Sequence, residues 1–161
     1  LQYFDPEDNQ NYIPYVVETS VGLDRMFLSV LASSYKEEKL ADGSERVVLR
    51  IPPALAPNKV SILPLMKKDG LPEKAMEIMN NLKFDVRCFY EEKDAIGKRY
   101  RRQDAIGTPY CLTIDHQTLE DNTVTLRDRD SMKQDRIAID SIPAIVDEKV
   151  SMKKLLAVLA N

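Results

Sequence analysis

Several residue types that build catalytic and metal sites are scarce in this sequence. It contains no tryptophan, one histidine (His116) and two cysteines (Cys88 and Cys111) among 161 residues. The cysteines form no CxxC pair and have no histidine near them, so neither a zinc-ligand set nor a redox dithiol is expected. A lone histidine also argues against a Ser-His-Asp triad. We interpret both cysteines as buried, reduced thiols of a cytosolic protein and predict no metal site.

The sequence also lacks a long apolar run. No stretch approaches the roughly 18 apolar residues that a membrane span needs, which argues against an integral membrane protein. Hydrophobic residues make up 43% and charged residues 30% of the chain. This balance is typical of a globular domain and not of a disordered or collagen-like chain. The chain begins at Leu1 without a basic and apolar leader. We therefore interpret it as a piece of a longer chain, one domain with an appendage.

Charge of one sign does not dominate either. The 23 Lys and Arg residues oppose 26 Asp and Glu residues, and the formal net charge is −3. Residues 1–50 hold five basic and nine acidic residues, whereas residues 51–161 hold 18 basic and 17 acidic ones. This balance argues against general binding of polyanions but leaves room for a local basic site.

The first third of the chain contains a strand, a helix and a proline-rich connection. Residues 15–18 have the composition of a strand, and apolar residues recur at helical spacing over about 22–38. Charged and turn-forming residues follow, and Pro52, Pro53 and Pro57 resist both helix and central strand. We interpret residues 40–58 as a linker.

Beyond residue 58, the pattern alternates between strand and helix. Strands separated by helices favour parallel pairing, while the short connection over 114–123 indicates one antiparallel strand. We predict an α/β fold, a three-layer α/β/α domain with a mixed, mostly parallel five-stranded sheet. Strands are predicted over residues 60–65, 86–90, 110–114, 123–126 and 136–139, helices over 71–82, 95–106 and from 141, a turn over 116–122, and a final helix from 151 with Met152, Leu155, Leu156 and Leu159 facing inward.

The strongest candidate site is a basic run on the helix predicted over 95–106. Four of the five residues 98–102 are basic and the fifth is tyrosine. Lysine and arginine neutralise phosphates, and an aromatic ring offers a stacking face, so the run is typical of an RNA contact. The alternative is a solvated helix face with internal ion pairs. The run consists of Lys98, Arg99, Tyr100, Arg101 and Arg102, and its acidic partners in the alternative are Glu91, Glu92, Asp94 and Asp104.

A second candidate follows the strand predicted over 123–126. Period-two alternation places Arg127 and Arg129 on one face and Asp128 and Asp130 on the other. Paired arginines at a strand edge suit an unstacked base, whereas a turn-forming ionic cluster is the structural alternative.

A third candidate lies between residues 18 and 25, where a predicted strand enters a helix through Gly22. The glycine permits a close backbone approach, and Arg25 in the first helical turn can hold an anionic group. Neither the GxxxxGK[ST] nor the GxGxxG phosphate-loop pattern is present.

Together these segments resemble class II aminoacyl-tRNA synthetases, in their glycyl-tRNA synthetase branch. Residues 14–25 resemble the third conserved motif of the catalytic domain, and later segments resemble the C-terminal anticodon-binding domain. The resemblance implies the end of a catalytic domain over residues 1–45, its third-motif strand and helix, and an anticodon-binding domain over residues 46–161. The segments of the second domain are Ala56–Val60, Ile62–Leu65, Ile96–Tyr100, Asp104–Tyr110 and Val124–Met132.

The resemblance also implies roles for single residues. Thr19 departs from the family pattern, where many relatives carry proline. ATP would be bound by Gly22, Leu23, Asp24 and Arg25; glycine by Glu18, Thr19, Ser20, Val21 and Gly22; and the glycine-specific tRNA, through its anticodon stem-loop, by Lys98, Arg99, Tyr100, Arg101, Arg102, Arg127 and Arg129.

The resemblance further implies a cytoplasmic, homodimeric enzyme that uses ATP with Mg²⁺ to attach glycine to tRNA through a glycyl-adenylate. The first two class II motifs are absent from residues 1–161, so this chain alone is expected to be inactive and to hold no cofactor. A non-catalytic RNA-binding or accessory protein built on the same domain is the alternative. An unrelated small α/β nucleotide-binding enzyme is a weaker one.

Overall fold

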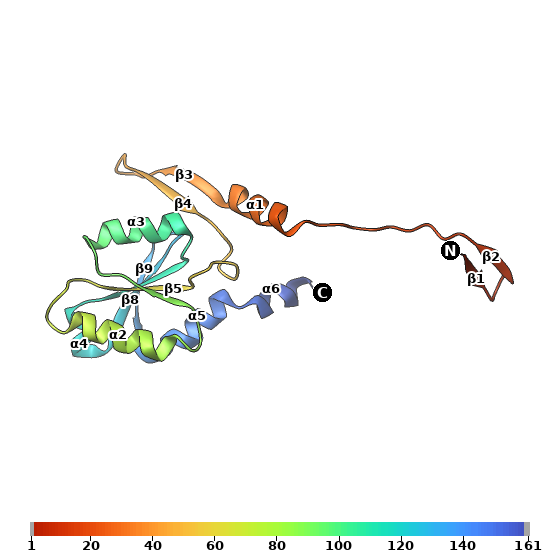
Figure 1. Cartoon of the computed structure of the whole chain (residues 1–161). Coiled ribbons are helices and arrows are strands. Elements are labelled where there is room, and N and C mark those ends of the chain that lie inside the picture. Colours follow the sequence, from red (N-terminus) through yellow and green to blue (C-terminus); the bar gives the residue numbers. More distant parts are fainter. Residues whose placement is uncertain (1, 160–161) are drawn as a thin grey trace.

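The computed structural model describes residues 2–159 of the chain. An α/β body carries two extensions, a long N-terminal arm and a C-terminal helix (Figure 1). The main sheet of the body has the strand order β6-β5-β7-β8-β9. Its strands are β5 (Val60–Pro64), β6 (Cys88–Tyr90), β7 (Tyr110–Ile114), β8 (Thr123–Asp128) and β9 (Gln134–Ala138).

The sheet is mixed, as predicted. Strand β5 pairs in parallel with β6 and β7, and β8 pairs antiparallel with β7 and β9. Strand β8 can reverse direction because the connection before it is short. That connection, predicted as a turn, is the helix α4 (His116–Asp121). It forms because the Asp115 carboxylate accepts a hydrogen bond from the Thr118 backbone N–H, which caps the first turn.

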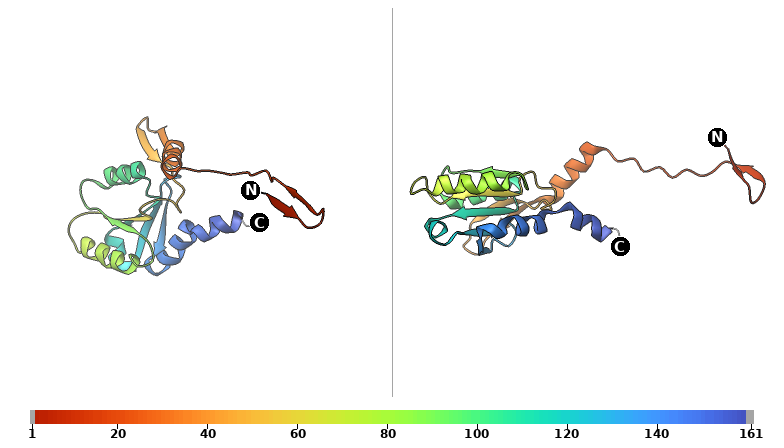
Figure 2. Two further views of the ribbon diagram at one scale, coloured as in Figure 1. Left: turned by 45° about the vertical axis from the view of Figure 1, so that its right-hand side comes forward. Right: turned by 90° about the horizontal axis from the view of Figure 1, so that it is seen from below.

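One face of the sheet carries the apolar core. Helix α2 (Leu71–Leu82) and helix α5 (Ile142–Val150), which follows the 3₁₀ turn η1 (Ile139–Ser141), supply one side of it. Each large apolar side chain of this core that is removed from water contributes about 1.5–3 kcal/mol to the free energy of folding. The views of Figures 1 and 2 agree that α2 and α5 lie below the sheet and α3 (Ile96–Ile106) above it. The main buried residues are Val60, Ile62, Leu71, Ala75, Ile78, Tyr110, Leu112, Ile114, Val124, Ile142 and Val146.

The opposite face of the sheet is polar. Because side chains alternate along strands, the residues between the core positions point toward α3. Ser61, Cys111 and Arg127 lie side by side there on β5, β7 and β8. Burial raises the pKa of the Cys111 thiol to about 12 and, together with Asp85, that of the half-buried Cys88 thiol to about 11. Helix α3 therefore packs on a layer whose largest side chain is an arginine.

A hairpin of β3 (Tyr35–Lys39) and β4 (Glu45–Leu49) packs beside α3. Two predictions from the sequence are wrong at this hairpin. The helix predicted over 22–38 is α1 (Leu23–Ser34) and ends where Tyr35 adopts an extended conformation. The linker predicted over 40–58 contains β4. Residues 36–39 are all charged and offer no apolar helix face, whereas Arg46 and Val48 alternate inward along β4.

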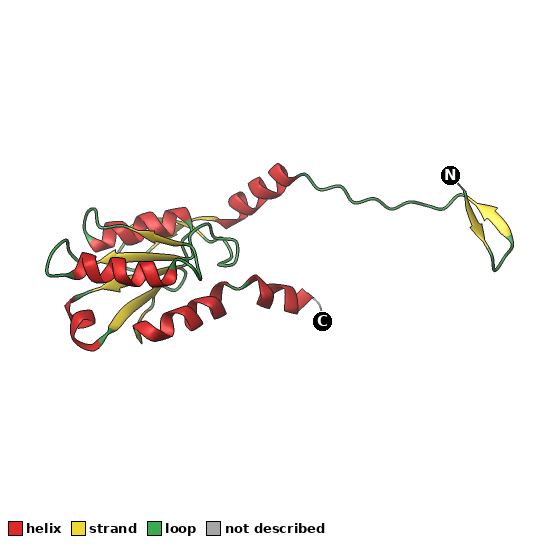
Figure 3. Cartoon of the chain, turned by 60° about the horizontal axis from the view of Figure 1, so that its bottom comes forward, coloured by secondary structure: helices red, strands yellow, loops and turns green. Residues whose placement is uncertain are grey.

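The N-terminal arm carries little packed structure. Residues 15–18, predicted as a strand, have no ladder partner within the described chain, and Tyr15 and Val17 are almost fully exposed. The arm begins with a small hairpin of β1 (Tyr3–Asp5) and β2 (Gln10–Tyr12), which Figure 3 shows far from the body. The apolar residues Leu23 and Phe27 of α1 are exposed as well. A strand needs a neighbouring edge for its backbone hydrogen bonds, and the described residues place none beside residues 15–18.

The last helix, α6 (Met152–Leu159), extends away from the sheet. The prediction that its apolar residues face inward is wrong for Met152, Leu156 and Leu159, which are exposed. The side chain of Leu155 lies outside the described residues. Helical spacing alone marks an apolar face but does not supply the surface that would cover it.

Candidate nucleic-acid interface

Helix α3 is fixed against the hairpin at its C-terminal end. The helix ends at Gly107, whose φ of +84° lies in the left-handed region. A Cβ atom at this position would lie 3.1 Å from the carbonyl oxygen of Leu49. Glycine is therefore required for both the backbone conformation and the close approach of β4.

Two of the four basic residues on α3 are bound within the domain. Arg99 is 1% exposed, and its Nη1 donates to the carbonyl oxygen of Pro64 at 2.6 Å, its Nη2 to that of Leu65 at 3.1 Å. Arg102 pairs with Glu91 at 2.5 Å and with Asp94 at 2.9 Å. For Arg102, the structure matches the alternative of an ion-paired helix face. For Arg99, the partners are carbonyl groups at the end of β5.

The other two basic residues border a hollow. Lys98 and Arg101 make no side-chain hydrogen bond or ion pair with residues 2–159. The hollow has a volume of about 360 Å³ and lies between α3, the end of β8 and the turn into β9. Its full lining is Gly97, Lys98, Tyr100, Arg101, Arg127, Met132 and Gln134.

Arg127 and Tyr100 contact each other in the wall of this hollow. The guanidinium carbon of Arg127 lies 4.7 Å from the centroid of the Tyr100 ring, within the range of a cation–π contact. The Tyr100 hydroxyl forms a hydrogen bond with Thr113 on β7. Burial raises the pKa of Tyr100, so the ring stays neutral at physiological pH. The half-buried Tyr100 ring is thus held in place beside Arg127, which is itself 4% exposed.

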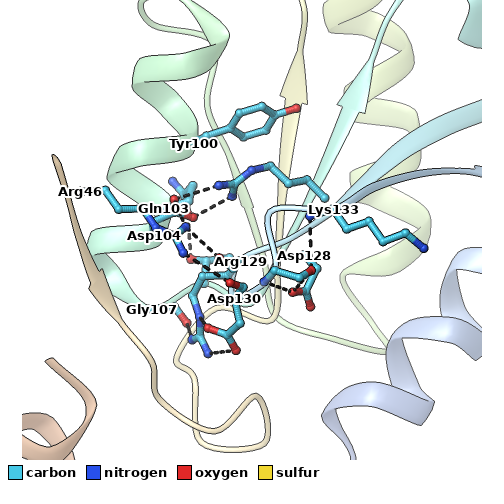
Figure 4. A network of polar contacts seen from close by, with 12 residues as sticks. Arg46, Tyr100, Gln103, Asp104, Gly107, Asp128, Arg129, Asp130 and Lys133 are labelled. Atoms are coloured by element: carbon cyan, nitrogen blue, oxygen red, sulfur yellow. Dashed lines mark hydrogen bonds and ion pairs between the residues drawn. The ribbon is translucent and has the colours of Figure 1, made fainter. Parts of the chain in front are cut away.

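Asp104 holds Arg127 in place. The Asp104 carboxylate is fully buried and accepts hydrogen bonds from Arg127 Nη1 at 2.7 Å and Nη2 at 2.9 Å. It also accepts one from Nη1 of Arg46, a residue of β4, at 3.1 Å. Figure 4 shows these contacts from close by. Arg46 is 3% exposed and pairs in addition with Glu38 at 2.7 Å. Arg46 and Arg127 thus share the buried Asp104 carboxylate, and Glu38 supplies a second carboxylate to Arg46.

Arg129 is also buried, at 2% exposure. Its Nη1 donates to the Gly107 carbonyl oxygen at 2.9 Å, and its Nε to the Asp130 carboxylate at 2.8 Å. Asp128 accepts from the Ser131 backbone and hydroxyl, which closes the turn after β8. The structural alternative for this segment, a turn-forming ionic cluster, describes these contacts (Figure 4). The shared face of Arg127 and Arg129 points toward α3 and not to solvent.

The predicted tRNA-binding residues fall into two groups, according to whether they line the hollow. Lys98, Tyr100, Arg101 and Arg127 line the hollow, whereas Arg99, Arg102 and Arg129 bind within the domain. The sequence pattern missed Met132 and Gln134, which follow the basic segment and have no periodicity that marks them. It also missed the anchoring role of Arg46. The alternation of Arg46 with Val48 is the one signal that could have revealed it.

The predicted ATP- and glycine-binding residues lie elsewhere in the molecule. Residues 18–25 are all exposed, and they run from the extended arm into the first turn of α1 (Figure 1). Gly22 has an extended backbone with φ of −81°. The roles of these residues stay a prediction.

Residues 2–159 contain neither a candidate metal-ligand cluster nor a membrane-spanning helix. No group of three or more His, Cys, Asp or Glu side chains in that range could hold a metal ion. No helix there is long and apolar enough to cross a membrane.

Comparison with known proteins identifies the family. A family model described as an anticodon binding domain matches residues 59–149. The chain is 55% identical over 150 residues to a glycine–tRNA ligase of Clostridium tetani, covering 93% of this chain and 32% of the relative. It is 50% identical over 150 residues to that of Borrelia hermsii, covering 93% of this chain and 34% of the relative. The chain thus spans about a third of the length of these relatives.

Solved structures show the same fold. The crystal structure of prolyl-tRNA synthetase from Cryptosporidium parvum with L-proline and AMP has a TM-score of 0.57 and 23% identity, covering 63% of this chain and 23% of that one. The likeness agrees with the mixed five-stranded sheet and its helices. The chain therefore belongs to the anticodon-binding domain family, and the curated relatives named above are glycine–tRNA ligases.

Proposed function

We propose that this chain is the tRNA-binding portion of a glycine–tRNA ligase, and that the hollow beside α3 receives part of the anticodon loop. The observation that carries the proposal is that two cations without an internal hydrogen bond or ion pair lie beside a fixed aromatic ring. Lys98 and Arg101 suit phosphate groups, and the Tyr100 ring, supported by Arg127, suits the face of an unstacked base.

The buried arginines take other roles in this proposal. Because Asp104 occupies both terminal nitrogens of Arg127, which is 4% exposed, that residue supports the Tyr100 ring and does not offer a fork of donors to a base edge. Arg99 and Arg129 stabilise the domain through backbone carbonyl groups. Direct contacts to RNA fall mainly to Lys98, Tyr100 and Arg101.

The activity of the whole protein is also a proposal. A complete enzyme would attach glycine to its tRNA, and ATP with Mg²⁺ would supply the activated glycyl-adenylate. We propose that it works in the cytoplasm as a homodimer. Within this chain, residues 18–25 would contribute to the ATP and glycine sites, but they are exposed and enclose no pocket by themselves. We expect no glycine-dependent ATP–pyrophosphate exchange from residues 1–161, and exchange would contradict this division of roles.

Titration with RNA stem-loops at several salt concentrations tests the tRNA-binding function. The wild-type chain should bind a stem-loop with a glycine anticodon more tightly than one with an unrelated loop. Replacing both Lys98 and Arg101 with alanine should weaken binding and lower the log–log salt slope by about one unit for each lost phosphate contact. The matched control is Lys83→Ala with Arg87→Ala, which removes the same two residue types between α2 and β6.

Two results would overturn the proposal. If the control pair weakens binding as much as the test pair, the RNA surface is not the hollow. If the wild type binds every loop equally, the chain is a general RNA-binding protein and not a reader of the anticodon.

A further inference from the structure

We propose that Arg46 and Asp104 are positioning residues for the RNA-binding hollow. Through Asp104, Arg46 holds the guanidinium of Arg127 beside the Tyr100 ring. The inference rests on the proposed function, since it concerns the same hollow. It adds that the β3–β4 hairpin, which contributes no residue to the lining, sets the shape of the wall.

The contacts form a continuous path from the hairpin to the hollow. Arg46 Nη1 lies 3.1 Å from Asp104 Oδ2, and Arg127 Nη2 lies 2.9 Å from the same oxygen. Asp104 Oδ1 takes the second hydrogen bond of Arg127 at 2.7 Å. The Arg127 guanidinium then meets the Tyr100 ring at 4.7 Å. Asp104 is fully buried and, like Arg46, does not line the hollow, so both residues act on RNA through the residues that they hold. Besides Asp104, Arg46 donates to the carbonyl oxygens of Arg129 at 2.9 Å and Asp130 at 3.4 Å.

The shared carboxylate explains why Arg46 affects Arg127. Because Asp104 bonds both arginines, each arginine limits where the carboxylate can turn to meet the other. Loss of the Arg46 guanidinium removes one of the three hydrogen bonds that hold the carboxylate, although Arg127 still neutralises its charge. The space left beside a fully buried carboxylate admits water or lets the carboxylate turn. Either event loosens Arg127 and the wall that it forms with Tyr100.

The position of the hairpin in the sequence makes this path of contacts relevant to the rest of the chain. The hairpin precedes residues 59–149, the part that matches the family model, and it follows α1 directly. The domain boundary predicted between residues 45 and 46 falls inside β4. The hairpin therefore connects the segment that leads into the body with the wall of the RNA site, so a displacement of the hairpin would change base binding.

The test compares two arginines of the same hairpin. Arg46→Met removes the buried charge and keeps an apolar stem of similar length. Arg50→Met is the matched control, because Arg50 also pairs with Glu38, at 2.6 Å, but is 41% exposed at its side chain and does not reach Asp104. Arg46→Lys retains the charge but lacks the guanidinium, whose separate nitrogens bond Glu38 and Asp104, and it serves if Arg46→Met does not fold.

The probe is the stem-loop with a glycine anticodon, and a series in which each loop nucleotide in turn is abasic. For the wild type, removal of one particular base should weaken binding about tenfold or more, the effect of one lost stack on an aromatic side chain. Arg46→Met should abolish most of that tenfold difference between the intact and the abasic stem-loop, and Arg50→Met should retain it. A merely structural role would lower the melting temperature without changing the ratio of the affinities for the intact and the abasic stem-loop.

A second measurement needs no RNA. Nuclear magnetic resonance of the Arg127 guanidinium, assigned with Arg127→Lys, should show restricted rotation in the wild type and in Arg50→Met. The restriction should be lost in Arg46→Met or Arg46→Lys. Retained restriction, or a retained abasic ratio, overturns the positioning role alone. Failure of the wild type to bind any stem-loop overturns the proposed function, and this inference with it.

Discussion

Asp104 accepts two hydrogen bonds from Arg127, at 2.7 and 2.9 Å, although the two residues lie 23 positions apart in the sequence. The contact joins α3 to β8 across the polar face of the sheet. It fixes the arginine in the wall of the hollow and removes it from the set of free cations. Several expected outcomes depend on this arrangement and on the contacts around it.

Asp104→Asn should destabilise the domain by about 3–5 kcal/mol, because it leaves Arg127 buried without a compensating charge and Arg46 with Glu38 alone. Urea unfolding followed by circular dichroism measures the loss. Asp94→Asn is the control. It breaks the exposed pair with Arg102 and should change stability little. Equal effects of the two substitutions would show that Asp104 is not a buried ionic centre.

Gly107→Ala should destabilise the domain by about 1–2 kcal/mol from the left-handed backbone conformation alone, with a further loss from the contact with Leu49. Gly97→Ala is a useful comparison because no atom lies within 4 Å of a Cβ built there and its φ is ordinary. Alanine at position 97 should stabilise α3 by up to about 1 kcal/mol. The midpoint of thermal unfolding should therefore fall for Gly107→Ala and rise for Gly97→Ala.

The Asp115 carboxylate should make stability depend on acidity. Burial opposes its ionisation, but hydrogen bonds from Arg136 and Thr118 prevail and lower its pKa below the usual value. The unfolded chain thus binds a proton more readily than the folded one. The stabilisation is present above the unfolded pKa of about 3.9 and is lost as pH falls through the lower folded value.

Asp115→Asn isolates that charge, because asparagine caps a helix as well as aspartate does. The difference in unfolding free energy between wild type and variant should be largest near neutral pH. It should shrink as the solution is acidified below about pH 4. A difference that does not change with pH would mean that the Arg136 pair contributes through packing and not through charge.

Neighbouring arginines on α3 should differ in their effect on RNA binding. Arg101→Ala should lower the salt slope of stem-loop binding by about one unit, since Arg101 borders the hollow without an internal ion pair. Arg102→Ala should leave the slope nearly unchanged, because Glu91 and Asp94 already neutralise that charge. Equal slopes for the two variants would argue against phosphate binding at the hollow.

Hydrogen exchange should separate the arm from the body. The amides of residues 13–22 have no helix or strand to protect them, so they should exchange nearly as fast as in an unfolded chain. Strands β5 and β7 are buried along their whole length and should exchange last. Protection of residues 13–22 comparable to that of β7 would show that the arm packs on a surface in solution.

Sequence patterns predicted the centre of this fold well. Strands β5 and β7 are unbroken buried runs bounded by proline, and α2 has its apolar residues on one face with proline in its first turn. Such local signals require no knowledge of partners. The sequence pattern did not reveal the hairpin because β3 is highly charged. The arginine that β4 buries, Arg46, has its partner, Asp104, 58 positions away in the sequence.

The candidate site was predicted less completely, for a related reason. A count of basic residues in 98–102 identifies the helix but does not separate Arg99 from Arg101. Arg99 is held by the carbonyl groups of Pro64 and Leu65, which any residue type possesses and which no side-chain pattern reveals. The hollow itself depends on the packing of α3 against β8, where tertiary contacts decide which cations remain available.

The sharing of one carboxylate by Arg46 and Arg127 has a consequence for sequence divergence. Loss of Asp104 leaves the buried Arg127 charge unbalanced, whereas joint replacement of the three side chains by apolar residues of similar volume is often neutral or stabilising. The three positions therefore form one epistatic unit, whose effects on stability are far from additive. A homologue in which they have changed together could keep this architecture intact while its capacity to bind RNA at this place has disappeared.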